Sequence, residues 1–188
     1  GLNGVSGLNG ANSSFLSADG KHAYATSSSG CVVWFDRNAS TGALVYRGKL
    51  QDGVNGVDGL NGARRVILSP DGSHAYVTAV GEDSVSWFER NATTGALSFG
   101  GLLKKDLNSI NGLNGAHGVA IASSGDHAYV TGNQDDSVSW FSRDPNTGAL
   151  VHVGTFKNVL MNGAREIILS ADQSHAYVSG YVDDSVSW

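Results

Sequence analysis

The chain is poor in cysteine, proline and charged side chains. Its 188 residues include one cysteine, two prolines and one methionine, and 15% of them are charged. The single cysteine, Cys31, excludes a framework of intramolecular disulfides, and we expect it to be a small buried residue. No apolar run approaches the roughly 20 residues of a membrane-spanning helix, and no segment resembles a signal peptide. The net charge of −5, with no basic cluster longer than Lys104-Lys105, argues against a nucleic-acid partner.

Glycine, in contrast, is abundant, with 26 residues, and serine, asparagine and threonine are frequent. This composition is typical of short strands joined by tight turns. No segment shows a sustained helical period. We therefore expect an all-β protein.

Four similar units follow one another along the chain. Aligning four tryptophans, which recur about every 50 residues, brings four histidines into register. The tryptophans are Trp34, Trp87, Trp140 and Trp188, and the histidines are His22, His74, His127 and His175. Such self-similarity indicates units that bury their faces only against their neighbours.

The second unit illustrates the secondary structure that we expect. Four runs of β-branched, aromatic or alternating residues are separated by turn sequences such as Pro70-Asp71-Gly72. The predicted strands cover residues 63–69, 74–78, 84–89 and 96–100. Four antiparallel strands per unit describe a blade of a β-propeller, whereas a parallel solenoid usually has shorter coils with fewer tight turns.

The predicted array spans the whole chain, residues 1–188, and has just under four blades. The blades cover residues 7–58, 59–111, 112–160 and 161–188, and the last one ends after its third strand. Propellers have about four to eight blades. The chain is thus predicted to be an excerpt of a longer one, half of a ring that a second copy completes, or an open array. We expect a homo-oligomer or self-assembly.

Residues that recur in every unit are interpreted as folding devices. The histidines lie one per blade, too far apart to converge on one metal ion. We expect them to join an Asp/His/Ser network within each blade, with the acidic turn residues Asp19, Asp71 and Asp172 and with the third-strand serines Ser84, Ser137 and Ser185. The tryptophans are expected to pack between adjacent blades.

Candidate functional residues lie where the units differ. The first strand of each blade lines the central channel, and the residue after each Asn-Gly-Ala varies: Asn12, Arg64, His117 and Arg165. The next position carries Ser13, Arg65, Gly118 and Glu166. Two guanidinium groups and an imidazole at one channel mouth suit a carboxylate, phosphate or carbonyl group. The alternative is a solvated rim, or polar plugs that only fill the channel.

Two further features have weaker patterns. The linker at residues 52–59 spaces Asp52, Asn55 and Asp58 with glycines between, which could wrap a calcium ion; otherwise no cofactor and no metal are expected. Three Asn-x-Ser/Thr sequons, at Asn12, Asn38 and Asn91, are candidate glycosylation sites, although Asn38 and Asn91 are repeat-equivalent and also suit turns.

The blade motifs resemble those of a known group of propellers. Residues 69–78, Ser-Pro-Asp-Gly-Ser-His-Ala-Tyr-Val-Thr, and the stretch Asp-Ser-Val-Ser-Trp-Phe that ends at Phe88 are similar to the blades of lactonase-type propellers and to the YVTN-type repeats of bacterial surface proteins. The enzymes of this group imply a lactone hydrolase. The resemblance then makes His117 the candidate catalytic residue, with Arg64 and Arg165 as ligands of a substrate carboxylate and Glu166 as a carboxylate partner.

The near-identity of the units favours the repetitive surface-protein branch. The main prediction is therefore an extracellular or cell-surface binding or assembly module, either adhesion- or lectin-like or a structural scaffold, and not an enzyme. Its weak sites would sum through avidity. A carbohydrate or a small anion is the expected ligand, with no membrane span. The alternative is the lactone hydrolase with an active site at the channel mouth.

Overall fold

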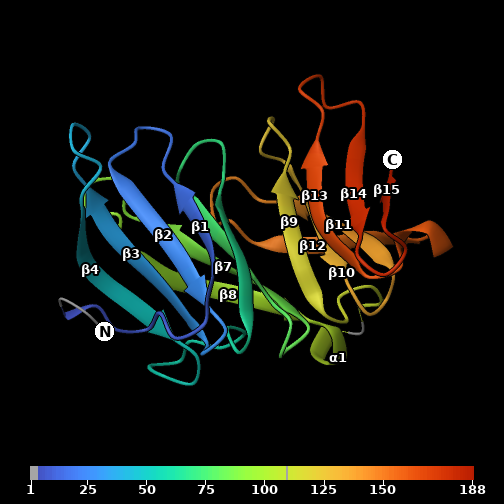
Figure 1. Ribbon diagram of the computed structural model, residues 1–188, viewed down its shortest axis with the longest axis horizontal. Helices are drawn as coiled ribbons and strands as arrows, with labels where there is room; N and C mark the ends of the chain where they lie inside the picture. Colours follow the sequence, from blue (N-terminus) through green and yellow to red (C-terminus); the bar gives the residue numbers. More distant parts are fainter. Residues whose placement is uncertain (1–3, 109) are drawn as a thin grey trace.

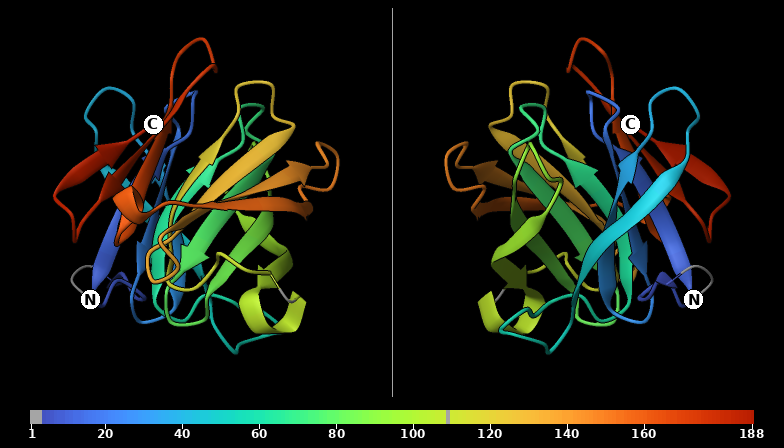
Figure 2. Two further views of the ribbon diagram at one scale, coloured as in Figure 1. Left: turned by 90° about the vertical axis from the view of Figure 1, so that its right-hand side faces the viewer. Right: turned by 90° about the vertical axis from the view of Figure 1, so that its left-hand side faces the viewer.

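The computed structural model describes residues 4–108 and 110–188 and shows an all-β propeller (Figure 1 and Figure 2). Three antiparallel sheets have four strands each, and a fourth sheet has three, as the sequence predicted. The first blade contains β1 (Ala11–Leu16), β2 (His22–Ser27), β3 (Cys31–Arg37) and β4 (Leu44–Gln51). The second contains β5 (Ala63–Leu68), β6 (His74–Ala79), β7 (Ser84–Arg90) and β8 (Leu97–Lys104).

The other two blades have the same order of strands. The third contains β9 (Ala116–Ile121), β10 (His127–Gly132), β11 (Ser137–Arg143) and β12 (Leu150–Lys157). The fourth contains β13 (Ala164–Leu169), β14 (Ala176–Gly180) and β15 (Ser185–Ser187). Two short helices, α1 (Lys105–Asn108) and η2 (Val159–Met161), lie in the linkers between blades. In the described part of the chain no helix has the length and apolar character to cross a membrane.

The first strands of adjacent blades contact one another, β1 with β5, β5 with β9, and β9 with β13. In Figure 1 the arrows of β9 and β13 point the same way, so both strands begin on the same side of the molecule. The residues that open these strands in different blades therefore come together at one end of the molecule.

Three hydrophobic clusters of the described residues lie between adjacent blades, and a fourth, around Val33 and Phe35, lies on the outer face of the first blade. Tyr24, Val32 and Trp34 of the first blade cluster with Phe88 and Leu97 of the second. Equivalent clusters join the second blade to the third and the third to the fourth. Trp34 is 9% exposed and packs as predicted, whereas Trp188, directly after the last strand, is 87% exposed. Cys31 is buried, which confirms that prediction.

Two of the four histidines, His22 and His74, do not act as the sequence predicted. Arg90 of the second blade reaches back to the first: its Nε donates to the Tyr24 hydroxyl at 2.6 Å and its Nη2 to His22 Nδ1 at 3.0 Å. Arg143 of the third blade does the same to Tyr76, at 2.5 Å, and to His74, at 2.9 Å. Because arginine only donates, each histidine Nδ1 accepts. These side chains therefore join two blades rather than the strands of one.

The predicted network within each blade is only partly present. Ser17 and Ser69 at the ends of the first strands donate to Asp19 and Asp71, and they accept from the backbone N–H of His22 and His74. His127 does stay within its own blade: its Nδ1 lies 2.8 Å from Asp126 Oδ1, which also accepts from Ser124 Oγ. The third-strand serines are not part of the network. They donate to backbone carbonyls of the preceding linker: Ser84 to Gly59, Ser137 to Gly112 and Ser185 to Leu160.

Two sequon asparagines are turn residues. Asn38 Oδ1 accepts from the backbone N–H of Ser40 and Thr41, and Asn91 Oδ1 accepts from those of Thr93 and Thr94. Such Asx turns explain asparagine at these positions without any sugar. Glycosylation of these exposed residues stays a prediction.

Candidate active site

The four variable residues that open the first strands stand beside an irregularity in the strand pairing. In every blade the register between the first and second strands shifts at this point, for example between Ala63 and Val66 of the second blade. A β-bulge of this kind turns side chains away from the regular alternation. The fully buried Ala63, Ala116 and Ala164 precede the bulge, because a larger side chain would not fit there.

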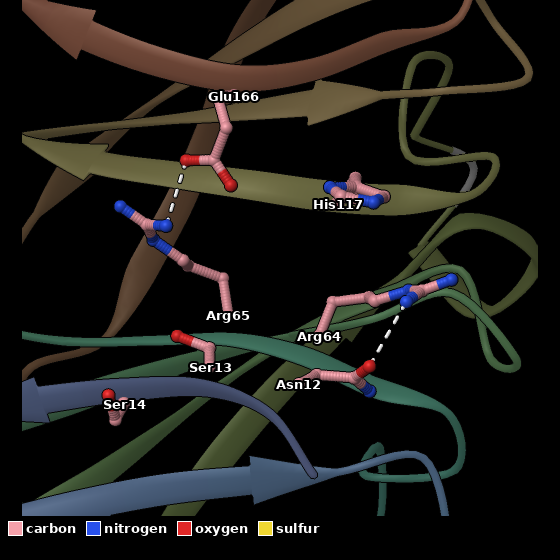
Figure 3. Close-up of a pocket in the computed structure, with 7 residues that line it drawn as sticks. All are labelled: Asn12, Ser13, Ser14, Arg64, Arg65, His117 and Glu166. Atoms are coloured by element: carbon pink, nitrogen blue, oxygen red, sulfur yellow. Dashed lines mark hydrogen bonds and ion pairs between the residues drawn. The ribbon is translucent and has the colours of Figure 1, made fainter. Parts of the chain in front are cut away.

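A cavity of about 260 Å³ opens at this end of the channel. Figure 3 shows the seven residues that line it, which come from all four blades. They are Asn12, Ser13, Ser14, Arg64, Arg65, His117 and Glu166. The structure thus brings together the predicted residues Asn12, Arg64 and His117 and, from the next position, Ser13, Arg65 and Glu166. Ser14 is added, whereas the predicted Arg165 and Gly118 are not among the lining residues.

Asn12 orients Arg64. Its Nδ2 donates to the Ala63 carbonyl at 2.7 Å, and its Oδ1 accepts from Arg64 Nη1 at 3.1 Å (Figure 3). Both polar atoms of the amide are used inside the channel mouth. Asn12 is exposed, and a glycan on its Nδ2 would replace one of the two amide hydrogens beside this contact; glycosylation here stays a prediction.

His117 is a half-buried residue whose Nδ1 atom is buried and unused. Its Nδ1 has no hydrogen-bond partner within the described residues. Burial, followed by the positive charges of Arg64 and Arg165, lowers the pKa of His117 to about 4. The imidazole is therefore neutral at pH 7 and has a lone pair or an N–H to offer.

Arg165 lies beside the site and does not line the cavity. Its guanidinium carbon is 3.4 Å from the centre of the Tyr181 ring, a cation–π contact. Its Nε is buried and has no partner in the described part of the chain. Arg165 thus adds positive potential near His117, while Tyr181, which the sequence analysis missed, holds its guanidinium.

Glu166 is not placed as the sequence predicted. Its Oε2 is 2.9 Å from Arg65 Nη1, so the carboxylate of the fourth blade pairs with a guanidinium of the second instead of His117 (Figure 3). The intervening strand β9 carries Gly118 at the same position. A Cβ there would stand 2.2 Å from the Arg165 carbonyl oxygen, so only glycine lets β9 and β13 approach this closely.

The electrostatic balance at the mouth favours an anion. The guanidinium groups of Arg64 and Arg65 and the carboxylate of Glu166 line the cavity, and the charge of Arg165 beside it adds to the positive potential at His117. In the described part of the chain, the buried side-chain polar atoms without a partner are Arg64 Nε, His117 Nδ1 and Arg165 Nε. Buried polar groups are normally hydrogen-bonded, so three unpaired nitrogens at one mouth indicate a place for a polar ligand.

A third carboxylate, that of Glu82, lies beside the predicted calcium ligands Asp52 and Asp58. Oxygens of Asp52, Asp58 and Glu82 lie within 4.8 Å of one another. However, Lys104 Nζ contacts Glu82 Oε1 at 2.7 Å, and Asp52 Oδ1 accepts from the Leu60 N–H. An ammonium group already offsets part of this charge, and calcium binding here stays a prediction.

The chain is similar to known proteins in both sequence and fold. The sequence matches the family described as "Lactonase, 7-bladed beta-propeller" over residues 9–159 and 65–188. No curated protein sequence matches.

Several solved structures share the fold. One is a 6-phosphogluconolactonase candidate of Bacteroides uniformis, with a TM-score of 0.77 and 15% identity over 94% of this chain and 49% of that one. A second, of Bacteroides fragilis and similarly described, has a TM-score of 0.63 and 27% identity over 77% and 38%. The periplasmic gluconolactonase of Pseudomonas aeruginosa has a TM-score of 0.66 and 24% identity over 77% and 39%. This chain spans half or less of each of these structures.

These matches overturn the main functional prediction. The prediction of an adhesion, lectin-like or scaffold module is wrong, since the family that the sequence matches is a lactonase family and favours the alternative interpretation. The regularity of the repeats misled the interpretation, because it reflects inter-blade packing that an enzyme needs as much as a scaffold does.

Proposed function

Since the chain belongs to the lactonase family of seven-bladed β-propellers, we propose that it is part of a lactone hydrolase with its active site at the channel mouth. The observation that carries this proposal is the group of three buried, unpartnered nitrogens on Arg64, His117 and Arg165. A lactone and its product offer the oxygen atoms that such nitrogens lack.

Lactone hydrolysis adds water to the ester carbonyl carbon. The carbonyl oxygen takes up negative charge in the tetrahedral intermediate, the bond from the acyl carbon to the ring oxygen then breaks, and a carboxylate and a hydroxyl group remain. Donors that face the developing oxyanion accelerate such a reaction. In our proposal, Arg64, which Asn12 orients, supplies these donors to the carbonyl oxygen or to a carboxylate of the substrate.

His117 would remove a proton from the attacking water. With a pKa of about 4 the free imidazole is neutral but a weak base. An anionic group bound beside Arg64 and Arg165 would offset the two charges that lower this pKa. The basicity of His117 would then rise when substrate is in place.

The test is lactone turnover by the full-length protein, with gluconolactone and 6-phosphogluconolactone as probes. His117→Gln should lower kcat by about a hundredfold or more, because general-base catalysis contributes roughly 10² to 10⁴. Arg64→Gln should mainly raise KM. His175→Ala, an exposed histidine outside the site, is the matched control and should leave both constants unchanged. Turnover that survives in His117→Gln would refute the assigned role.

An extracellular or periplasmic location is proposed together with this activity. It is supported by the likeness to a periplasmic gluconolactonase. Self-association of the chain also remains a proposal, which light scattering coupled to size exclusion can test.

A further inference from the structure

The bulges at the channel mouth leave peptide groups that the strand ladder does not pair. In the second blade these belong to the peptide between Arg64 and Arg65, and in the third to that between His117 and Gly118. Unpaired peptide groups inside a protein need other partners. The partners prove to be side-chain hydroxyls from the second strands.

Three fully buried threonines donate to the carbonyls of the site residues. Thr26 Oγ1 of the first blade donates to the Arg64 carbonyl at 2.8 Å. Thr78 of the second donates to that of His117 at 2.6 Å, and Thr131 of the third to that of Arg165 at 2.6 Å. Each hydroxyl therefore crosses from its own blade to the next.

The same hydroxyls accept from the other side of these peptides. The Arg65 N–H donates to Thr78 Oγ1 at 3.2 Å, and the Gly118 N–H to Thr131 Oγ1 at 2.7 Å. In the fourth blade the Glu166 N–H donates to Ser179 Oγ at 3.1 Å.

Hydroxyl groups and peptide groups thus alternate in a single chain of hydrogen bonds. It runs from Thr26 through the peptide after Arg64, then through Thr78, the peptide after His117, Thr131 and the peptide after Arg165 to Ser179. All the bonds point in one direction, so the groups polarise one another. A side chain can serve in this chain only if it both donates and accepts, which valine cannot do.

We propose that Thr26, Thr78 and Thr131 are positioning residues of the channel-mouth site, each fixing the backbone that carries Arg64, His117 or Arg165. The catalytic consequence rests on the proposed function, whereas the backbone consequence does not. His117 Nδ1 has no partner among the described residues, and the ring's hydrogen bond is to the backbone of Arg165, so the positions of these two backbone segments set the direction of the imidazole. A small rotation of the peptide after His117 would displace the ring from the reacting water.

The experiment compares Thr78→Val, which keeps the shape and removes the hydroxyl, with Thr78→Ser, which keeps the hydroxyl. In Thr78→Val, hydrogen exchange of the Arg65 amide should speed up by about tenfold or more. The pKa of His117, followed by NMR, should rise, because a displaced ring would lose part of the burial and of the proximity to Arg64 and Arg165 that lower it. The kcat for the lactone probe should fall on the order of tenfold with little change in KM. Thr78→Ser should stay close to the parent protein in all three measurements.

Ser86→Ala is the matched control. Ser86 is fully buried in the same blade, and its hydroxyl also bonds a backbone carbonyl, that of Gly59, at 3.1 Å, but it does not touch the site peptides. It should lose stability and leave the His117 titration and kcat unchanged. Equal effects of Ser86→Ala and Thr78→Val would mean that Thr78 is merely structural, and would overturn the proposal.

Two results separate this inference from the proposed function. If the parent protein turns over no lactone, the proposed function fails, while exchange and titration still test the positioning role. If turnover is present and Thr78→Val alters neither the His117 titration nor kcat, the positioning role fails alone. If Thr78→Val does not fold, two other variants test the proposal. Thr131→Val should speed up hydrogen exchange of the Gly118 amide, and Thr26→Val should change KM through Arg64. Unchanged values in these variants would equally overturn the proposal.

Discussion

The histidines at the junctions between blades and the histidine at the channel mouth differ in what their Nδ1 atoms contact. His22 and His74 lie at the junctions between blades, where an arginine of the next blade donates to Nδ1. His117 lies at the mouth, where Nδ1 has no partner among the described residues. All three have a lowered pKa, caused first by burial and then by arginine charges. At the junctions the arginine donates a hydrogen bond to the imidazole and so stabilises the contact between two blades. At the mouth the arginines lower the pKa of His117 but leave its Nδ1 without a partner among the described residues, so that Nδ1 is available to a ligand.

The largest expected effect tests the junctions. Arg143 is 4% exposed and bonds the Tyr76 hydroxyl, His74 and the Gly125 carbonyl. Arg143→Met should lower the free energy of unfolding by about 3 kcal/mol, because it removes three hydrogen bonds that a buried charged donor makes to groups of two blades. Urea unfolding measures this, and Arg47→Ala, at an exposed ion pair with Asp36, should cost about 0.5 kcal/mol or less. Similar losses in both variants would mean that the junctions are not special.

The next effect tests how closely the blades approach at the mouth. Gly118→Ala forces a Cβ against the Arg165 carbonyl and should lower the free energy of unfolding by about 2 kcal/mol or more. It should also lower lactone turnover, since β9 carries His117. Ser13→Ala, at the equivalent position of the first blade, should change stability by no more than about 0.5 kcal/mol. A well-folded, fully active Gly118→Ala would show that this approach is not needed.

The third prediction concerns acid. Since the folded protein lowers the pKa of His22, His74 and His117 below the value in the unfolded chain, the unfolded chain binds more protons between these values. Stability conferred by the neutral imidazoles is complete above about pH 6.5 and falls as the pH drops towards about 4. His117→Gln should remove on the order of 2 kcal/mol of this dependence. Urea titrations at several pH values measure the slope, and an unchanged slope would contradict the burial of a neutral His117.

The smallest effect separates the ion pair from the catalytic group. The Arg65 and Glu166 side chains are 36% and 45% exposed, so Glu166→Gln should cost about 0.5 kcal/mol at most. We expect kcat for the lactone probe to change by less than about threefold, since Glu166 pairs with Arg65 rather than with His117. A loss comparable to that of His117→Gln would restore Glu166 as the partner of the imidazole.

The strands were predictable because their physics is local. Alternation in residues 84–89 and the Pro70-Asp71-Gly72 turn predicted a strand and a turn that the structure shows as β7 and the turn before β6. The candidate residues Arg64 and His117 were found because they vary where everything else repeats. Arg165 was found by the same argument. Its stacking on Tyr181 could not be predicted, because Arg165 lies in β13 and Tyr181 in the turn after β14.

By itself the sequence determined the blades, their number of strands and the positions that open the channel, because turn chemistry and strand alternation depend on adjacent residues. Only the tertiary structure decided which blades exchange contacts. The partners of Arg90, Arg143 and Glu166 belong to other units, more than one repeat period away in some cases, and a repetitive chain offers each of them several chemically identical choices. The packing of one blade on the next selects one choice, and the bulges that this packing accommodates decide which nitrogens remain unpaired at the mouth.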